Sequence, residues 1–238
     1  MITLKYVLFF IQTKLIELLP SQPCILCGAS TRIDTWCNEC DASLPYLNND
    51  LCPICSLPTF NAEVCGRCLQ SPPHYNRTVT VFAYAFPISK LVLALKYAAR
   101  FQLATTFAKK LVQRISVRPD FIVAMPLHAS RLTERGFNQS FQLAYHIGQQ
   151  LKIPVMPNAC LRLRNTPSQS TLPLKERGKN MRKAFSCTSM VSGKHVAIVD
   201  DVMTTGATLN ELAWALKEAG AIEVSAWVVA RTLTHHDH

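Results

Sequence analysis

Apolar and polar residues follow two periodicities over residues 77–238 of this 238-residue chain. Short runs of β-branched, aromatic and other apolar residues have the length and composition of buried strands. They lie at residues 78–85, 121–125, 195–199 and 224–230. Helical segments are predicted to begin near Pro87 and to cover residues 102–114, 138–150 and 207–219. Strands that alternate with helices predict an α/β fold with a parallel, doubly wound sheet.

The first 22 residues have a different pattern. Apolar side chains recur near helical spacing and are interrupted by a few charged residues, which predicts an amphipathic helix over residues 1–22. The longest unbroken apolar run, residues 6–11, is too short to cross a bilayer. We therefore expect no transmembrane segment, and a signal peptide is not favoured because no small-residue cleavage site precedes Cys24. The apolar face of the helix is expected to pack on the core or on a partner, with membrane-surface contact as the alternative.

Eight cysteines form an internal repeat within residues 23–70. Each copy reads Cys-x₂-Cys-x₉-Cys-x₂-Cys, and the second copy is displaced from the first by 28 residues. The members are Cys24, Cys27, Cys37, Cys40, Cys52, Cys55, Cys65 and Cys68. Two such pairs supply four thiolates, a common ligand set of structural zinc. The repeat predicts two Cys₄ zinc sites with sequential pairing, one site in each copy, and an interleaved pairing is the alternative.

Disulfides are the competing interpretation of these cysteines. They would need an oxidising compartment, and nothing else in the sequence indicates one. Segments this short and polar bury little core, so we expect bound metal to supply much of their folding free energy. Cys160 and Cys187 lie outside the repeat and are expected to be ordinary buried cysteines.

The formal net charge of +10 is unevenly distributed. Residues 1–70 carry four basic and six acidic residues, a net charge of −2, whereas residues 71–238 carry 21 basic and nine acidic residues, a net charge of +12. The C-terminal part therefore suits polyanions such as pyrophosphate or nucleic acid. Ionised thiolates would make the cysteine repeat still more acidic, so we expect it to have a structural or partner-docking role rather than to bind DNA.

Residues 196–208 carry the most specific chemical signal in the chain. An apolar strand ends in Asp200 and Asp201, and a turn rich in Thr and Gly leads into the predicted helix. Backbone N–H groups at a helix N-terminus favour a phosphate, and Gly206 lets the backbone approach it closely. The carboxylates can accept hydrogen bonds from ribose hydroxyls or bind Mg²⁺. Both can reach one sugar only if the strand has ended, because strand residues alternate between faces. This order predicts a site for a phosphorylated sugar, and an ordinary turn with a Thr cap is the alternative.

The same residues resemble the 5-phosphoribosyl-1-pyrophosphate (PRPP) motif of the type I phosphoribosyltransferase family. That motif is a hydrophobic strand, two acidic residues, a spacer and Thr-Thr-Gly-(Ala/Ser)-Thr. The resemblance implies a sheet of the type I phosphoribosyltransferase kind, with Asp200 and Asp201 at the ribose in the catalytic position and Mg²⁺ bound with PRPP. The residues that it implies for the 5′-phosphate are Thr204, Thr205, Gly206, Ala207 and Thr208.

Three further segments resemble the ComF family of competence proteins, a branch of the same superfamily. They are residues 125–140, residues 162–185 and Leu95-Lys96-Tyr97, although Ala99 stands where that family leads us to expect glycine. With the cysteine repeat and residues 196–208, the resemblance covers nearly the whole chain. It implies a cytoplasmic role in natural transformation, or a place at the inner face of the membrane. It also implies contact with incoming single-stranded DNA and with other competence proteins.

Basic residues in these segments are the expected contacts of the anions. Arg131 and Arg135 follow a predicted strand, and their spacing lets both reach one anion if their loop is helical. With Lys96 they are the expected PRPP contacts, and a solvated helix face is the alternative for the two arginines. Residues 162–183 form a long polar loop, which is usually functional in a compact α/β domain. Its expected loop or DNA contacts are Arg162, Arg164, Lys175, Arg177, Lys179, Arg182 and Lys183.

Two functions are compatible with the sequence. The first is a PRPP-binding competence protein that contacts single-stranded DNA. The second is an active phosphoribosyltransferase of nucleotide metabolism, in which a nitrogen nucleophile attacks the ribose and the arginines hold the leaving pyrophosphate. The chain shows no pattern that identifies a base-recognising pocket, which disfavours the second. We expect three parts: an N-terminal helix (1–22), a double zinc ribbon (23–70) and a PRPP-binding domain of the phosphoribosyltransferase type (71–238).

Overall fold

The computed structural model describes residues 21–32, 34–164 and 184–233. Over these residues the chain divides into two compact units, with the boundary between Leu44 and Pro45. The helix predicted at the N-terminus falls almost wholly on residues 1–20, outside the described residues. None of the helices in the described part of the chain is both long and apolar enough to cross a membrane.

The smaller unit is a short cysteine-rich fold. β1 (Gln22–Pro23) pairs antiparallel with β2 (Ser30–Thr31), and α2 (Asn38–Ala42) begins directly after Cys37. The Trp36 indole N–H donates a hydrogen bond to the Asp41 carboxylate at 2.7 Å. The buried hydrophobic residues described in this unit are Cys24, Trp36, Cys37 and Leu44. A core of this size cannot by itself hold a chain segment folded.

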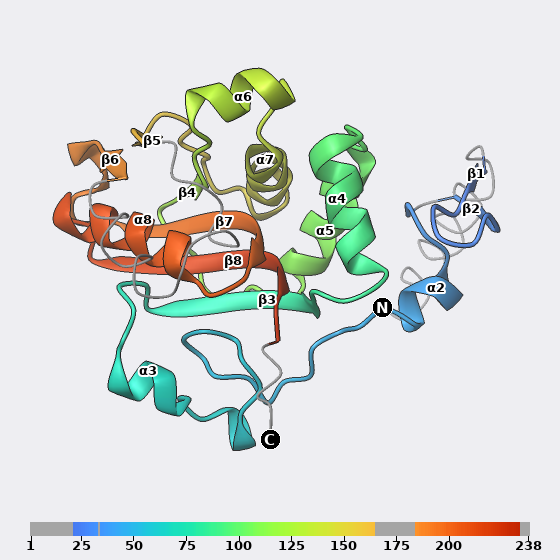
Figure 1. Ribbon diagram of the computed structural model, residues 1–238, viewed down its shortest axis with the longest axis horizontal. Helices are drawn as coiled ribbons and strands as arrows, with labels where there is room; N and C mark the ends of the chain where they lie inside the picture. Colours follow the sequence, from blue (N-terminus) through green and yellow to red (C-terminus); the bar gives the residue numbers. More distant parts are fainter. Residues whose placement is uncertain (1–20, 33, 165–183, 234–238) are drawn as a thin grey trace, which may run out of the picture. The chain divides into compact units, whose positions relative to one another are not determined.

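The larger unit is built on a four-stranded parallel sheet with the order β3-β8-β7-β4 (Figure 1). The strands are β3 (Arg77–Ala83), β4 (Phe121–Ala124), β7 (His195–Met203) and β8 (Glu223–Arg231). Most of their residues are buried, as expected of a parallel sheet that is covered on both faces. The predicted α/β fold is confirmed, and each of the four predicted strands coincides with one of these strands.

Helices cover both faces of the sheet. α5 (Gln102–Val112) packs beside α7 (Gln139–Leu151) on one face, and α4 (Ile88–Tyr97) packs against α5. α8 (Ala207–Glu218) packs on the other face, where Figure 1 shows it lying across β7 and β8. Val196 and Ile198 of β7 join the hydrophobic cluster of α8, whereas Ala197 and Val199 alternate with them and are buried outside that cluster.

Smaller elements complete the larger unit. They are η1 (Phe60–Ala62), α3 (Gly66–Gln70), α6 (Ala129–Arg135), β5 (Cys160–Arg162), β6 (Phe185–Cys187) and η3 (Ser189–Val191). β5 and β6 pair antiparallel, and Cys160 lies directly opposite Cys187. Cys160 is buried as predicted, but Cys187 is only half-buried.

β7 extends beyond the predicted strand. It continues through Met203 rather than ending at residue 199, so Asp200 and Asp201 lie within the strand. The cause is its parallel neighbour, because β8 stays paired with β7 to the position where Met203 lies opposite Arg231. The expectation that the strand ends before the acidic pair is therefore wrong.

The second cysteine repeat belongs to the larger unit and is hydrogen-bonded to the edge strand β3. The Thr78 N–H donates to the Pro53 carbonyl at 3.1 Å, and the Thr78 hydroxyl donates to the Ile54 carbonyl at 2.6 Å. The Ser56 hydroxyl donates to the Thr78 carbonyl at 3.0 Å. Three of the four cysteines are buried in the same hydrophobic cluster as α8. The two copies of the repeat thus belong to different compact units although their spacing is identical.

Gly148, in α7, is expected to be intolerant of a side chain. A Cβ at this position would lie 2.7 Å from the Ile153 carbonyl oxygen and 2.7 Å from the Val155 side chain. We expect Gly148→Ala to lower the free energy of unfolding by about 1–3 kcal/mol, because overpacking outweighs the better helix propensity of alanine. Urea denaturation followed by circular dichroism measures the change. Gly66→Ala is the control, since no atom lies within 4 Å of a Cβ there. Equal effects of the two substitutions would contradict this prediction.

Candidate functional site

Asp201 is a buried carboxylate at the centre of the site. The Lys96 ammonium, in the last turn of α4, lies 2.8 Å from its Oδ1, and the Gln139 side-chain amide donates to its Oδ2 at 2.8 Å. The exposed fraction of the side chain is 4% for Asp201 and 21% for Lys96. Burial lowers the pKa of Lys96, but the charge and hydrogen bond of Asp201 outweigh this effect and raise it. Lys96 is therefore positively charged at neutral pH.

Asp200 is the more accessible of the two carboxylates. The Ser140 hydroxyl and the Asp201 backbone N–H both donate to its Oδ1 at 2.9 Å. Within the described part of the chain, no hydrogen bond is made to its Oδ2. Burial and the charge of Asp201 raise the pKa of Asp200 to about 7, against the opposing effects of Lys96 and Ser140. Asp200 thus has an oxygen available for a hydroxyl group or a cation, and it loses its proton only near neutral pH.

The N-terminus of α7 supplies the partners of both carboxylates. Asn138 caps this helix, because its side-chain oxygen accepts from the Ser140 N–H at 2.9 Å and from the Phe141 N–H at 3.3 Å. The cap fixes Gln139 and Ser140 at adjacent positions of the first turn. Neither residue is among the predicted site residues. Asn before an apolar helical pattern is a recognisable start signal, but it does not say what the following side chains contact.

The loop at residues 204–208 connects β7 to α8. Gly206 is the N-cap residue of α8, with a φ of 84° in the left-handed region that favours glycine. Thr204 and Thr205 are exposed, and the Thr205 hydroxyl accepts from the Ala207 N–H at 3.4 Å. Thr208 lies in the first turn of the helix. The first N–H groups of an α-helix have no intrahelical partners, so a loop of this form can accept an anion.

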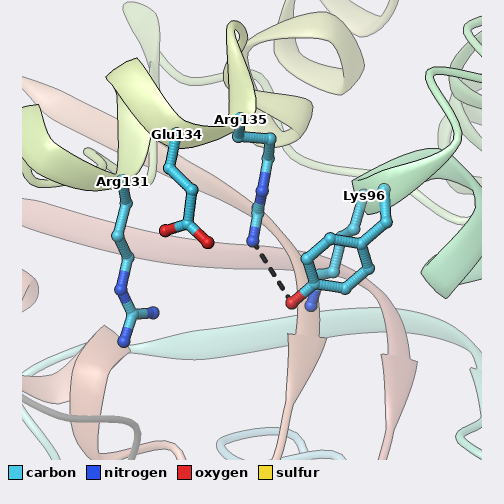
Figure 2. Close-up of a pocket in the computed structure, with 5 residues that line it drawn as sticks. Lys96, Arg131, Glu134 and Arg135 are labelled. Atoms are coloured by element: carbon cyan, nitrogen blue, oxygen red, sulfur yellow. Dashed lines mark hydrogen bonds between the residues drawn. The ribbon is translucent and has the colours of Figure 1, made fainter.

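A cavity of about 360 Å³ lies beside Lys96 (Figure 2). Its lining residues are Lys96, Tyr97, Arg131, Glu134 and Arg135. Figure 2 shows Arg131 and Arg135 reaching down from α6 and Lys96 entering from α4. Arg135 donates to the Gln139 side-chain oxygen at 2.5 Å and to the Tyr97 hydroxyl at 3.5 Å, and its guanidinium lies 4.9 Å from the centre of the Tyr97 ring. Three cations around one cavity form an environment suited to a pyrophosphate.

α6 is the helix that brings the two arginines to this cavity, in a segment predicted as a loop. It begins after His128, whose ring nitrogen accepts from the Ser130 N–H at 3.3 Å, and it ends at Gly136, which has a φ of 78°. His128 thus serves as the N-cap residue of this helix. The four-residue spacing places Arg131 and Arg135 one turn apart on the same side of this helix.

Arg162 and Arg164 are the two members of the predicted basic loop set that the structure describes. The Arg162 side chain donates to the Arg164 carbonyl at 3.3 Å, and its guanidinium lies 5.6 Å from the centre of the Phe185 ring. Burial and the charge of Arg131 lower the pKa of Arg162, and the charge of Asp200 opposes them. The other predicted members, Lys175, Arg177, Lys179, Arg182 and Lys183, lie outside the described residues.

The eight cysteines of the repeat lie in two groups of four, with the sequential pairing that was predicted. In each group the four Sγ atoms lie within 4.8 Å of one another. The Sγ–Sγ distance is 3.7 Å for Cys27 and Cys37 and 3.6 Å for Cys55 and Cys65. Tetrahedral zinc with Zn–S bonds of about 2.3 Å requires a separation of about 3.8 Å, so both groups fit the metal.

Backbone N–H groups favour the thiolate form of one cysteine in each cluster, Cys24 in the first and Cys52 in the second. The Cys37 N–H donates to the Cys24 Sγ at 3.3 Å, and the Cys65 N–H donates to the Cys52 Sγ at 3.4 Å. Burial raises the pKa of Cys52, but hydrogen bonds from backbone groups, that of Cys65 foremost, outweigh it and lower the pKa to about 7. The same balance lowers the pKa of Cys24 to about 6. Thiols of this kind are readily deprotonated by a metal ion.

Family models match both parts of the chain. The model of the double zinc ribbon domain matches residues 15–69, and the model of the phosphoribosyl transferase domain matches residues 138–236. Together with the geometry of the two clusters, the first match supports structural zinc at the cysteines. The second match includes the acidic pair, the loop at residues 204–208 and the start of α7.

Relatives match nearly the whole chain. DNA utilization protein YhgH of Escherichia coli (strain K12) is 37% identical over 221 residues, which cover 88% of this chain and 97% of the relative. Competence protein F of Haemophilus influenzae is 32% identical over 222 residues, which cover 82% of this chain and 96% of the relative. Among solved structures, the glutamine PRPP amidotransferase of Bacillus subtilis is 25% identical over 52% of this chain and 25% of its own, with a TM-score of 0.38.

Proposed function

This chain belongs to the ComF family of competence and DNA utilization proteins, and from that premise we propose that it binds PRPP with Mg²⁺ and contacts single-stranded DNA. The proposal places the protein in the cytoplasm, where it would handle DNA that enters the cell in natural transformation. Its ligand site would be the acidic pair, the loop at residues 204–208 and the cavity beside Lys96.

Each part of the site suits one part of PRPP. The loop N–H groups and Thr hydroxyls would bind the 5′-phosphate, and Asp200 would accept from ribose hydroxyls or hold Mg²⁺. Arg131, Arg135 and Lys96 would bind the pyrophosphate. Bound Mg²⁺ would neutralise part of the charge of the pyrophosphate. Asp201 is already paired with Lys96 at 2.8 Å, so its role would be to position this lysine.

One observation carries the proposal. Two adjacent carboxylates in the C-terminal part of the central strand β7, before its end at Met203, are followed by a Gly-capped helix N-terminus and lie beside a cavity with three basic side chains. A sugar with phosphates at both ends requires this order of groups, because its anionic ends need cations or N–H donors and its hydroxyls need acceptors.

Calorimetry with PRPP and Mg²⁺ tests this part of the proposal. We expect wild-type protein to bind PRPP, and we expect Asp200→Asn to weaken the binding by at least tenfold while the fold is kept. Ser192→Ala, in the loop after η3, is the control and should bind like the wild type. Absence of PRPP binding to the wild type would overturn the proposal.

Pyrophosphate release with a panel of purine and pyrimidine bases would reveal whether the bound ligand is also turned over.

The affinity for PRPP is expected to rise with pH. The pKa of Asp200 is raised to about 7, so most of this carboxyl group is protonated at pH 6 and ionised at pH 8. A proton on Asp200 competes with Mg²⁺, so the affinity should rise by about tenfold between these pH values. In Asp200→Asn only the ionisation of PRPP itself remains, and the rise should be smaller. Calorimetry at several pH values measures the change in affinity. An equal rise in affinity with pH for the wild type and Asp200→Asn would contradict the assignment of Asp200 as a ligand-binding carboxylate.

Aromatic side chains next to the cationic cavity favour contact with single-stranded DNA. Tyr97 is 70% exposed and stacks with Arg135, and Phe101 is 43% exposed and contacts the Phe137 ring, with the ring centres 4.9 Å apart. Exposed aromatic rings beside basic groups are the usual platform for unpaired bases.

Fluorescence anisotropy with a labelled single-stranded oligonucleotide tests the DNA contact. We expect binding that weakens with salt, and a loss of affinity of at least tenfold in Arg177→Ala/Arg182→Ala/Lys183→Ala. Lys90→Ala/Lys152→Ala/Lys194→Ala removes the same charge from three exposed lysines elsewhere and is the control. Lack of binding to the wild type at moderate salt, or an equal loss in both variants, would count against the DNA contact.

A further inference from the structure

Arg231, the last residue of β8, is completely buried. Its guanidinium Nη1 donates to the Met203 carbonyl at 3.0 Å, to the Thr204 carbonyl and to the Thr232 carbonyl at 2.9 Å. Its Nε donates to the Cys55 carbonyl at 3.0 Å. One side chain therefore connects the end of β7 and the first residue of the candidate phosphate loop with the second cysteine cluster.

Packing around the loop makes the same connection. Tyr75 and Met203 are buried in one hydrophobic cluster with Cys52, Cys55 and Cys68. A Cβ on Gly206 would lie 2.6 Å from the Met203 methyl group and 3.0 Å from the Tyr75 hydroxyl, so these side chains press against the loop. A cavity of about 200 Å³ is lined by Arg67 and Cys68 of the repeat together with Thr205, Gly206 and other residues. The second cysteine repeat and the loop are thus in direct contact within the larger unit.

The charge of a zinc-loaded second cluster can account for the burial of Arg231. Transfer of a guanidinium from water into a protein interior is unfavourable unless it is paired. The buried Arg231 side chain lies next to the second cluster, because its Nε donates to the carbonyl of Cys55, one of the four cysteines. Four thiolates around one Zn²⁺ carry a net charge of about −2, so a zinc-loaded second cluster supplies the missing counter-charge. An empty cluster with protonated thiols supplies none.

We propose that zinc in the second cysteine cluster fixes the conformation of the phosphate loop through Arg231. With Met203 and Thr204 carbonyls held inward by this side chain, the N–H groups of the following residues remain directed to a ligand. Loss of metal from the second cluster then loosens the loop and weakens the binding of a phosphorylated ligand. The role of the loop as a phosphate site rests on the proposed function, whereas the dependence of its conformation on Arg231 and on the metal does not.

Hydrogen exchange of the loop, measured by mass spectrometry on the full zinc-loaded chain, tests the proposal without a ligand. The amides that report on the loop are those of Thr232, which donates to the Met203 carbonyl at 3.0 Å, and of Asn210, which donates to the Gly206 carbonyl at 2.9 Å. In Arg231→Lys we expect these two amides to exchange at least tenfold faster than in the wild type. Arg114→Lys is the matched control, because Arg114 also donates to two backbone carbonyls, those of Thr80 and Leu47, at a distance from the loop in sequence. In Arg114→Lys the amides that report on the loop should exchange at the wild-type rate.

Metal content is varied with one cysteine from each cluster. Cys55→Ser should lose one zinc ion and speed the exchange of the Thr232 and Asn210 amides, whereas Cys27→Ser should lose one zinc ion and leave both amides protected. Cys68→His, which keeps a zinc ligand, should also leave them protected. Should Cys55→Ser fail to fold, Arg231→Lys and Cys68→His decide the question. Unchanged loop exchange in Arg231→Lys, or equal exposure in Arg231→Lys and Arg114→Lys, would overturn the inference.

The ligand measurement separates this inference from the proposed function. If wild-type protein binds PRPP, Arg231→Lys should weaken binding by at least tenfold, and Arg114→Lys should not. If the wild type does not bind PRPP but the loop exchanges as predicted, the proposed function fails and the inference stands. If the wild type binds PRPP and the exchange of the loop does not depend on Arg231, the inference fails and the proposed function stands.

Discussion

Replacing Lys96 with methionine is expected to lower the free energy of unfolding by about 3–5 kcal/mol. The substitution keeps the length of the side chain but removes the ammonium that lies 2.8 Å from the Asp201 carboxylate. Asp201 is only 4% exposed, so its charge would be left in the interior with the Gln139 amide as its described donor. Breaking a buried ion pair from one side is costly because the remaining charge has lost both water and its partner. Chemical denaturation at pH 7 measures the loss.

A double substitution tests the cause of this loss. Lys96→Met/Asp201→Asn removes both charges, and we expect it to recover most of the stability because the Asn side chain can still accept from Gln139. Lys90→Met is the matched control, since Lys90 is exposed on the same helix, and its effect should stay within about 0.5 kcal/mol. If Lys96→Met costs no more than Lys90→Met, the pair contributes nothing to stability and the assignment of Asp201 as a positioning group loses its support.

The order of strands and helices could be predicted from the sequence because it depends on local patterns. The apolar runs that became β4 and β8 are bounded by polar or Pro residues, and their burial on both faces needs no knowledge of their partners. The loop at residues 204–208 could be predicted for the same reason. Its Gly-capped turn is encoded within a few residues, and Gly206 adopts the positive φ that such a turn requires.

The extension of β7 could not be predicted, since it depends on a neighbour. The two residues after Val199 are aspartates, which are depleted in strands, so this local composition favours an end of the strand there. Pairing with β8 continues to Met203 and overrides that local preference. Two carboxylates in consecutive strand positions point to different sides of the strand. The helix that Asn138 caps supplies a separate donor to each, Gln139 to Asp201 and Ser140 to Asp200. Contacts across some 60 residues of sequence leave no local signal.

The burial of Arg231 could not be predicted from the sequence either. In the sequence Arg231 follows an apolar strand, where a basic residue is usually the first solvated position after the strand. In the structure it is fully buried, because four backbone carbonyls from three separate segments surround its guanidinium. The cysteine spacing likewise leaves sequential and interleaved pairing open, because both satisfy the same ligand count. Only the Sγ positions separate the two.

Replacing Cys37 with serine is expected to remove one zinc ion per chain and to unfold the smaller unit. This unit has only four buried hydrophobic residues among those described, two of which are cysteines of the first cluster. Zinc binding to such sites contributes about 10–16 kcal/mol at neutral pH, as much as or more than the whole stability of a typical domain. We therefore expect faster amide exchange over residues 21–44 and exposure of the Trp36 indole. Native mass spectrometry gives the metal content, and hydrogen exchange gives the unfolding.

The extent of the unfolding distinguishes the two pairings in solution. With sequential pairing, Cys37→Ser empties the first cluster alone, so amides near Cys52 and Cys65 should stay protected. With interleaved pairing, the same substitution would empty a site that holds cysteines of both copies, and protection would be lost in both. Cys187→Ser is the control, because this half-buried cysteine lies outside the repeat and its loss should leave two zinc ions bound. Retention of both ions in Cys37→Ser would show that the first cluster does not depend on four thiolates, contrary to the Sγ geometry.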